Sequence, residues 1–115
     1  MIKPRQVLFV CDANMLRSPT AEKLYSGVPG LLVKSAGLNS DVVVPVTLEL
    51  VAWADIVFVM ERRQRNKLHK LIGDLYDSRE VVCLYIPDEY ALMDPVLVHL
   101  LKEKLSPYLG PVDEG

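Results

Sequence analysis

Short runs of apolar residues alternate along the chain with longer stretches in which apolar residues recur at helical spacing. The run at residues 7–10 is continuous, which is typical of a strand buried on both faces. Three further runs are short and rich in valine, leucine and isoleucine. The pattern therefore predicts four strands, at residues 7–10, 31–33, 56–59 and 81–86.

The stretches between these strands predict helices with recognisable ends. Ser18 and Pro19 are expected to open the first, since serine is a preferred N-cap and proline fits the first helical position. Asp94 and Pro95 are expected to open the last for the same reason. The predicted helices cover residues 18–28, 45–53, 61–72 and 94–108. The tail after Gly110 is expected to fray.

Four strands alternating with four helices predict an α/β fold of three layers, in which helices cover both faces of a four-stranded parallel sheet. Crossover connections are right-handed, which leaves few strand orders, and we expect the flavodoxin-like order 2-1-3-4. Ligands of such a sheet bind where the carboxyl ends of strands 1 and 3 diverge. Residues 1–115 are expected to form this single domain.

The composition agrees with an ordinary globular domain, since 50% of the 115 residues are hydrophobic and 24% are charged. The net charge of -2 and the pI near 5.6 differ from the strongly basic character of nucleic-acid-binding domains. We therefore expect no nucleic-acid partner. The basic residues of the third predicted helix are interpreted as a solvated face: Arg62, Arg63, Arg65, Lys67 and Lys70.

No apolar run approaches the roughly 20 residues of a membrane span, and the run at residues 7–10 is too short for a signal-peptide core. A cytoplasmic chain without membrane contacts is therefore expected. Its two cysteines, Cys11 and Cys83, suit a reducing compartment, and no disulfide is expected. Two histidines and no CxxC pair predict neither a metal nor another cofactor.

The candidate chemistry lies in the segment that joins the first strand to the first helix. Cys11 and Arg17 stand six positions apart, and Ser18 follows directly. A loop of this length can curl so that its backbone N–H groups point inward and bind an anion, and the helix N-terminus adds positive charge. The same surroundings stabilise a cysteine thiolate. The planar guanidinium of Arg17 can hold two phosphoryl oxygens.

The residues expected to bind phosphate are those of this loop: Asp12, Ala13, Asn14, Met15, Leu16, Arg17 and Ser18. Asn14 suits the sharp reversal, because asparagine tolerates a left-handed backbone. A cysteine that ends a buried strand is also compatible with a core role, and its spacing to an arginine is a weak indication by itself. The additional presence of Asn14, Ser18 and Pro19 at this junction favours the anion-binding interpretation.

Residues 7–11, Asn14 and residues 17–22 resemble the phosphate-binding loop of the low-molecular-weight protein tyrosine phosphatases. Residues 35–37 resemble the second-strand signature of that family. Residues 55–61 resemble its third strand and the acidic residue that follows. The resemblance is most specific over the first twenty-two residues, covers the middle in patches, and extends over the last third by pattern only.

The resemblance implies a protein tyrosine phosphatase that hydrolyses phosphomonoesters through a phosphocysteine intermediate. Cys11 would attack phosphorus, while Arg17 and the loop amides would hold the phosphoryl oxygens. Ser18 would hydrogen-bond the sulfur. An aspartic acid would protonate the leaving oxygen and then activate water. The implied partners are a phosphorylated protein or a small phosphomonoester, with inorganic phosphate as the inhibitory product.

Three features of the sequence depart from the family pattern. Leu16 stands where the family often has a second cysteine. Asp12 stands where a neutral or basic residue is usual; its carboxylate would weaken anion binding if it points inward, or select a basic substrate flank if it points outward. The segment between Gly37 and Asp55 is shorter by about one helix, which predicts a more open pocket.

The general acid has two candidates. Asp88 follows the fourth predicted strand within two residues of Ile86, at the sheet edge where Cys11 also emerges. Tyr90 then takes the family's aromatic, substrate-lining position, although Glu89 replaces the usual proline. Asp94 precedes a proline and is explained by helix capping. We therefore predict Asp88, with Asp94 as the alternative.

Two other functions are compatible with the same loop. A non-catalytic module that binds phosphate or phosphopeptides would explain Asp12 and the shortened segment between Gly37 and Asp55. An arsenate reductase would need further accessible thiols to pass electrons, and the only other cysteine of the chain is Cys83.

Overall fold

The computed structural model describes residues 3–111. The strands are β1 (Arg5–Cys11), β2 (Leu31–Gly37), β3 (Ile56–Val59) and β4 (Glu80–Cys83). The helices are α1 (Arg17–Tyr25), α2 (Leu48–Trp53), α3 (Arg62–Ile72), the 3-10 helix η1 (Gly73–Ser78) and α4 (Pro95–Leu109). The tail beyond residue 111, for which fraying is expected, lies outside the described residues.

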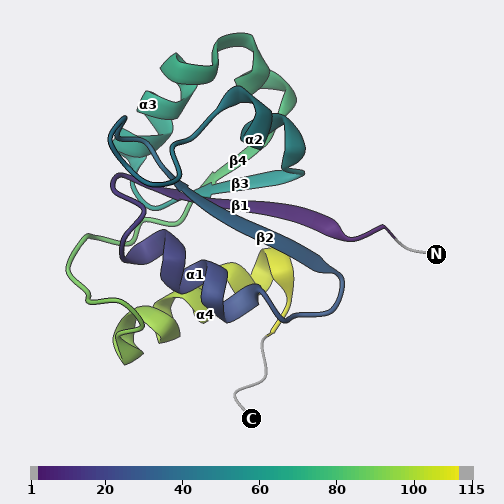
Figure 1. Ribbon diagram of the computed structural model, residues 1–115. Coiled ribbons are helices and arrows are strands. Elements are labelled where there is room, and N and C mark those ends of the chain that lie inside the picture. The colour runs from purple at the N-terminus through teal and green to yellow at the C-terminus, as the bar shows by residue number, and fades with distance from the viewer. Residues whose placement is uncertain (1–2, 112–115) are drawn as a thin grey trace.

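The four strands form one parallel sheet in the order β2-β1-β3-β4, which confirms the predicted topology. Helices α1 and α4 cover one face, and α2 and α3 cover the other (Figure 1). In β1 the side chains of Val7, Leu8, Phe9 and Val10 are fully buried, because they alternate between the two helical layers. This explains why the strand is continuously apolar.

Helices α3 and α4 begin where polar side chains cap them. Glu61 and Gln64 form a reciprocal capping box at the start of α3. Asp94 accepts a hydrogen bond of 2.8 Å from the Val96 N–H at the start of α4, which confirms its predicted capping role. These two caps are local interactions that a sequence pattern can indicate.

Two predicted helix starts are wrong. Helix α1 starts at Arg17, and Ser18 is not its N-cap. Helix α2 starts at Leu48 rather than near Pro45, because Thr47 caps it and Pro45 instead bridges to Gly37 of β2.

Strand β4 is shorter than predicted at its carboxyl end. It ends at Cys83, because Tyr85 takes a left-handed backbone conformation with φ of 56°. The N–H groups of Leu84 and Ile86 still donate to β3 and to Met60, each at 2.8 Å. The segment after β4 therefore remains attached to the sheet while it turns toward the loop after β1.

No helix within residues 3–111 is long and apolar enough to cross a membrane.

Candidate functional site

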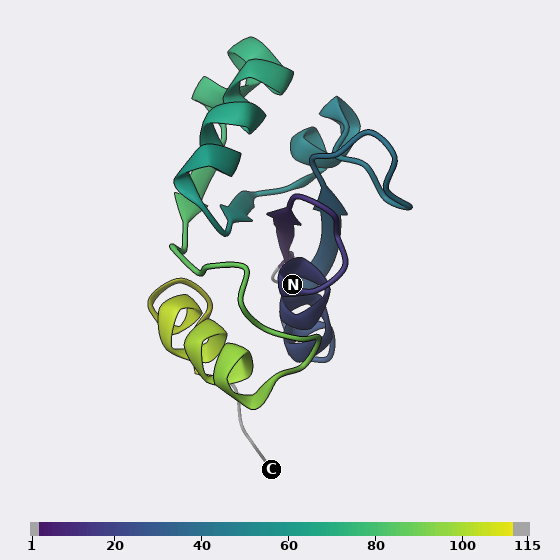
Figure 2. The same ribbon diagram turned by 90° about the vertical axis from the view of Figure 1, so that its left-hand side faces the viewer.

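The segment after β1 and the segment after β4 lie at the same edge of the sheet, where the parallel strands end (Figure 2). Between them is a cavity of about 220 Å³. It is lined by Cys11, Asp12, Ala13, Met15, Leu16, Arg17 and Asp88. The topology thus brings the predicted loop residues together with Asp88, which is 71 positions after Arg17 in the chain.

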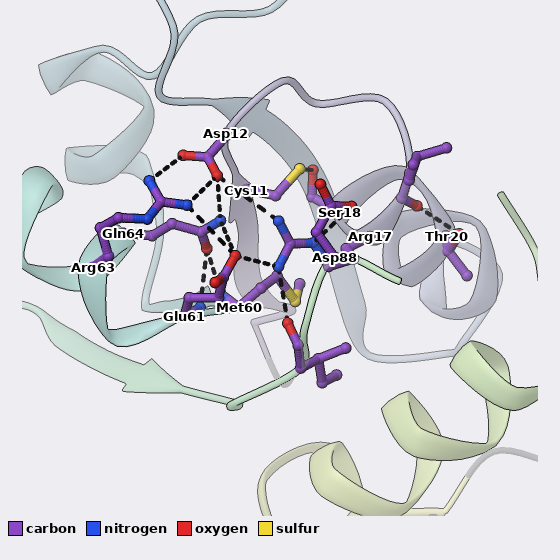
Figure 3. Close-up of polar contacts among 12 residues, drawn as sticks. Cys11, Asp12, Arg17, Ser18, Thr20, Met60, Glu61, Arg63, Gln64 and Asp88 are labelled. Carbon is purple, nitrogen blue, oxygen red and sulfur yellow. Dashed lines mark hydrogen bonds and ion pairs between the residues drawn. The ribbon is translucent and has the colours of Figure 1, made fainter. Parts of the chain in front are cut away.

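Cys11 ends β1 and is nearly buried, with 3% of its surface exposed. Its sulfur lies 3.0 Å from the Ser18 hydroxyl oxygen (Figure 3). That oxygen also accepts a hydrogen bond of 2.9 Å from the side-chain amide of Asn14. Because Asn14 occupies a lone pair of the hydroxyl, the hydroxyl proton is available to donate to a Cys11 thiolate.

A chain of polar side chains supports this contact from β2 and α1. Asn14 donates a second hydrogen bond, of 3.0 Å, to the Ser35 hydroxyl. Ser35 in turn donates to the Glu22 carboxylate at 2.7 Å. Asn14 has φ of 55°, which confirms the predicted left-handed reversal. The loop conformation therefore depends on residues of two neighbouring elements.

Gly37, at the end of β2, allows the loop to pack directly on the strand. A Cβ atom there would lie 2.7 Å from the carbonyl oxygen of Asp12 and 3.1 Å from Asn14. The next residues hold the loop from the same side, since Leu38 donates to the Cys11 carbonyl at 2.9 Å and Asn39 to that of Asp12 at 3.0 Å. The glycine is required by this close approach of two backbones.

We expect Gly37→Ala to displace the loop and to weaken the binding of inorganic phosphate by about tenfold or more, because small misplacements of positioned groups are costly. Calorimetric titration with phosphate measures this effect. Gly27→Ala is the matched control, since its Cβ would meet no atom within 4 Å. Equal phosphate affinity in both variants would contradict a role for Gly37 in shaping the loop.

Arg17 is almost fully buried at the start of α1, with 3% of its surface exposed. Its Nη1 atom donates to the Glu61 carboxylate at 2.7 Å and to the Ile86 carbonyl at 2.8 Å. Nη1 carries two hydrogens, so these two bonds use it completely. The Nε and Nη2 atoms remain, and this edge of the guanidinium is the one that can hold two oxygens of an anion.

Two carboxylates lie close to that free edge without hydrogen-bonding it. Asp12 Oδ2 is 3.8 Å from Nη2 of Arg17, and Asp88 Oδ1 is 3.9 Å from Nε. The Asp88 side chain is 62% exposed, so it faces the open side of the cavity. Asp94, the alternative acid, is instead engaged as the cap of α4.

The Asp12 carboxylate is turned toward α3. Arg63 donates to it with both terminal nitrogens, at 3.1 and 2.6 Å, and Gln64 donates at 3.0 Å. The hydrogen bond from Arg63 is the main cause that lowers the pKa of Asp12 below its usual value. Gln64 lowers this pKa further, while burial opposes the shift. Arg63 lies on the predicted solvated face, since its side chain is 61% exposed, but its guanidinium also pairs with the loop.

Tyr90 lies two residues beyond Asp88 and is half-buried. It packs against the core between the sheet and α4, and it is not among the residues that line the cavity.

Sequence reasoning missed several residues that support the site. Glu61 was recognised only as an acidic residue after the third strand, and nothing indicated its bond to Arg17. Thr20 hydrogen-bonds the Leu16 carbonyl at 2.6 Å and accepts from the Met93 N–H at 3.0 Å, so it links α1 to the segment that carries Asp88. Only the Glu61–Gln64 spacing of the capping box could have been noticed beforehand.

No protein-family model matches the chain, and no curated protein matches it in sequence. Solved structures do match. Wzb of Vibrio vulnificus, in complex with benzylphosphonate, has a TM-score of 0.73 and 20% identity, over 90% of this chain and 96% of that one. A low-molecular-weight protein tyrosine phosphatase of Streptococcus pyogenes has a TM-score of 0.75 and 15% identity, over 91% and 93%.

The YwlE arginine phosphatase from Geobacillus stearothermophilus is also similar, with a TM-score of 0.73 and 22% identity over 92% of this chain and 93% of that one. At these identities the similarity concerns the fold. The fold that the sequence resemblance implies is therefore confirmed over about nine-tenths of the chain.

Proposed function

We propose that this chain is a cysteine-dependent phosphatase that hydrolyses phosphomonoesters, with phosphotyrosine as its substrate class. The observation that supports it most is the convergence of a nucleophile, an anion-binding edge and an acid on one cavity: Cys11, Arg17 and Asp88. Its fold neighbours include a tyrosine phosphatase of Erwinia amylovora, and Wzb of Vibrio vulnificus in complex with benzylphosphonate. The reaction is compatible with the cytoplasm, where thiols stay reduced.

In the first step the Cys11 thiolate attacks phosphorus, and an S–P bond forms as the P–O bond to the leaving group breaks. The Nε and Nη2 atoms of Arg17 hold two phosphoryl oxygens. Ala13 and Met15 hydrogen-bond to no other group within residues 3–111, so their N–H groups are available to further oxygens. Asp88, entering as the carboxylic acid, gives its proton to the leaving oxygen.

In the second step water attacks the phosphocysteine. Asp88, now a carboxylate, takes a proton from the water as the new P–O bond forms. The S–P bond breaks and the sulfur leaves as a thiolate, which the Ser18 hydroxyl stabilises by hydrogen bonding. Inorganic phosphate is released, and because it occupies the same loop it also acts as a competitive inhibitor.

The rim of the cavity favours an aromatic leaving group. The Met15 side chain is 68% exposed at this rim, and Leu16 lines the cavity beside it. An exposed apolar side chain next to the phosphate loop can pack on a phenyl ring, whereas a charged guanidinium gains less from an apolar contact. We therefore favour phosphotyrosine over phosphoarginine. Tyr90 does not line this cavity, and its contact with a substrate ring stays a prediction.

An arsenate reductase is disfavoured by the position of the second thiol. Cys11 belongs to the core between the sheet and helices α1 and α4, whereas Cys83 packs on the opposite face of the sheet. Strand β3 also lies between β1, which carries Cys11, and β4, which carries Cys83. The two sulfurs therefore cannot exchange electrons without a rearrangement of the sheet.

The pH–rate profile with a small aryl phosphate tests the proposal. We expect hydrolysis with a bell-shaped profile, because the thiolate and the protonated acid are needed together. Inorganic phosphate should inhibit competitively. Phosphotyrosine and phosphoarginine peptides are then compared by kcat/KM, and a preference for phosphoarginine would overturn the substrate assignment. Tight phosphate binding without any hydrolysis would instead identify a binding module.

A further inference from the structure

The charges around the cavity do not favour an anion by themselves. Five charged side chains from three parts of the chain are joined by ion pairs at this cavity: Asp12, Arg17, Glu61, Arg63 and Asp88. Three are acidic and two are basic, so this group has a net negative charge before any substrate enters. A site for a phosphoryl group therefore needs an arrangement that keeps the negative charges from acting on it.

Asp12 is the critical carboxylate, because it is the residue directly after the nucleophile. It lies 3.8 Å from Nη2 of Arg17, the edge that the phosphoryl group needs. A free carboxylate at this position would compete with the substrate for Arg17 and repel it.

Arg63 pairs with Asp12 from the opposite side. Both of its terminal nitrogens contact the carboxylate, and the closer distance is 2.6 Å (Figure 3). This bidentate geometry is the strong form of an arginine–carboxylate pair. Its distances are shorter than the 3.8 Å between Asp12 and Arg17, so the carboxylate is held by α3 and not by the substrate-binding arginine.

Gln64 fixes the direction of this pairing. Its side chain is fully buried. Its amide nitrogen donates to Asp12 at 3.0 Å, while its amide oxygen accepts from the N–H groups of Met60 and Glu61 at 2.9 and 3.0 Å. Because these bonds attach Gln64 to the end of β3, the first turn of α3 has a defined position relative to the loop.

We propose that Arg63 is a positioning residue of the phosphate site: by neutralising Asp12 and holding its carboxylate toward α3, it keeps the Nε–Nη2 edge of Arg17 available to the phosphoryl group. This inference rests on the proposed function and adds a residue to it. Arg63 does not touch the substrate. It acts through Asp12, and without Asp12 it would not be needed.

A double-mutant cycle separates this electrostatic role from a simple tether between loop and helix. The variants are Arg63→Gln, Asp12→Asn and the double substitution. Arg63→Lys keeps the positive charge and loses the two parallel hydrogen bonds of the guanidinium. Arg62→Gln is the matched control, because it removes the same charge from the neighbouring, exposed position of α3. Thermal unfolding establishes that each variant is folded.

The first measurement is the rate at which iodoacetamide alkylates Cys11 at a fixed, mildly acidic pH. This reagent is neutral, so its own approach does not respond to the charges under test. An uncompensated carboxylate beside the sulfur disfavours the thiolate, and we expect Arg63→Gln to slow alkylation by about tenfold. Asp12→Asn should be as fast as the unmodified protein or faster. The alkylation rates of the double variant and of Arg63→Lys should lie within about threefold of the rate of the unmodified protein.

The second measurement is the dissociation constant of inorganic phosphate. We expect Arg63→Gln to weaken binding most, and Asp12→Asn, the double variant and Arg63→Lys to bind phosphate more tightly than Arg63→Gln. If Asp12→Asn weakens phosphate binding as much as Arg63→Gln does, and the double variant binds no more tightly, the pair is a tether between loop and helix. That result would overturn the proposal. A response of Arg63→Gln no larger than that of Arg62→Gln would overturn it too. If the unmodified protein neither binds phosphate nor hydrolyses esters, the proposed function fails, and the alkylation rates still decide the role of Arg63.

Discussion

Cys11→Ser should abolish aryl phosphate hydrolysis, with a loss of roughly 10⁴-fold or more, because removal of a nucleophile disables every later step. A serine hydroxyl stays protonated at neutral pH, and the side chain that contacts this position is another hydroxyl, that of Ser18. An alkoxide is also a poorer leaving group than a thiolate in the second step. Steady-state turnover of a small aryl phosphate measures the loss.

Phosphate binding should survive the same substitution, since Arg17 and the loop are unchanged. Calorimetric titration with inorganic phosphate is expected to give a dissociation constant within about threefold of the unmodified protein. Cys83→Ser is the matched control and should retain full turnover, because Cys83 packs on the other face of the sheet. Comparable turnover of Cys11→Ser and the unmodified protein would disprove the cysteine mechanism.

Asp88→Asn should lower turnover by roughly 10²- to 10⁴-fold, the usual contribution of a positioned acid. Asparagine keeps the size of the side chain but has no proton to give to the leaving oxygen. The alkaline limb of the pH–rate profile should flatten as well, because that limb reports the deprotonation of the acid. Turnover of an activated aryl phosphate with a good leaving group should fall less than that of phosphotyrosine.

Asp94→Asn provides the comparison, since it changes the other candidate in the same way. Asp94 caps α4 through the Val96 N–H, and asparagine is a comparable cap. Turnover should therefore stay near that of the unmodified protein, with a stability change of at most about 1 kcal/mol. An inactive Asp94→Asn together with an active Asp88→Asn would reverse the assignment.

Features that depend on neighbouring residues could be predicted from the sequence. The continuous apolar runs predicted buried parallel strands, and their alternation with helical segments predicted the sheet order. The Asp94-Pro95 cap was predictable because an N-cap and its N–H donor are two residues apart. The left-handed Asn14 was predictable because the backbone preference belongs to the residue itself.

Local patterns failed where a tertiary contact competed with them. Ser18 has the sequence of an N-cap, yet its hydroxyl contacts Cys11 and Asn14 instead of a backbone N–H. The fourth strand was predicted to continue to Ile86, but the segment turns at Tyr85. The carbonyl of Ile86 then binds Arg17.

The charge arrangement of the candidate site depends on how the elements pack. Sequence left two directions open for Asp12, and it could not indicate that the carboxylate pairs with Arg63, 51 positions away. In the sequence, Arg63 was indistinguishable from the other basic residues of α3. Helical periodicity places a side chain on a face of α3, but only the packing of α3 against β3 and β4 determines which loop that face meets. The physical reason is that ion pairs depend on distances between side chains, and these distances are set by the fold and not by the spacing along the chain.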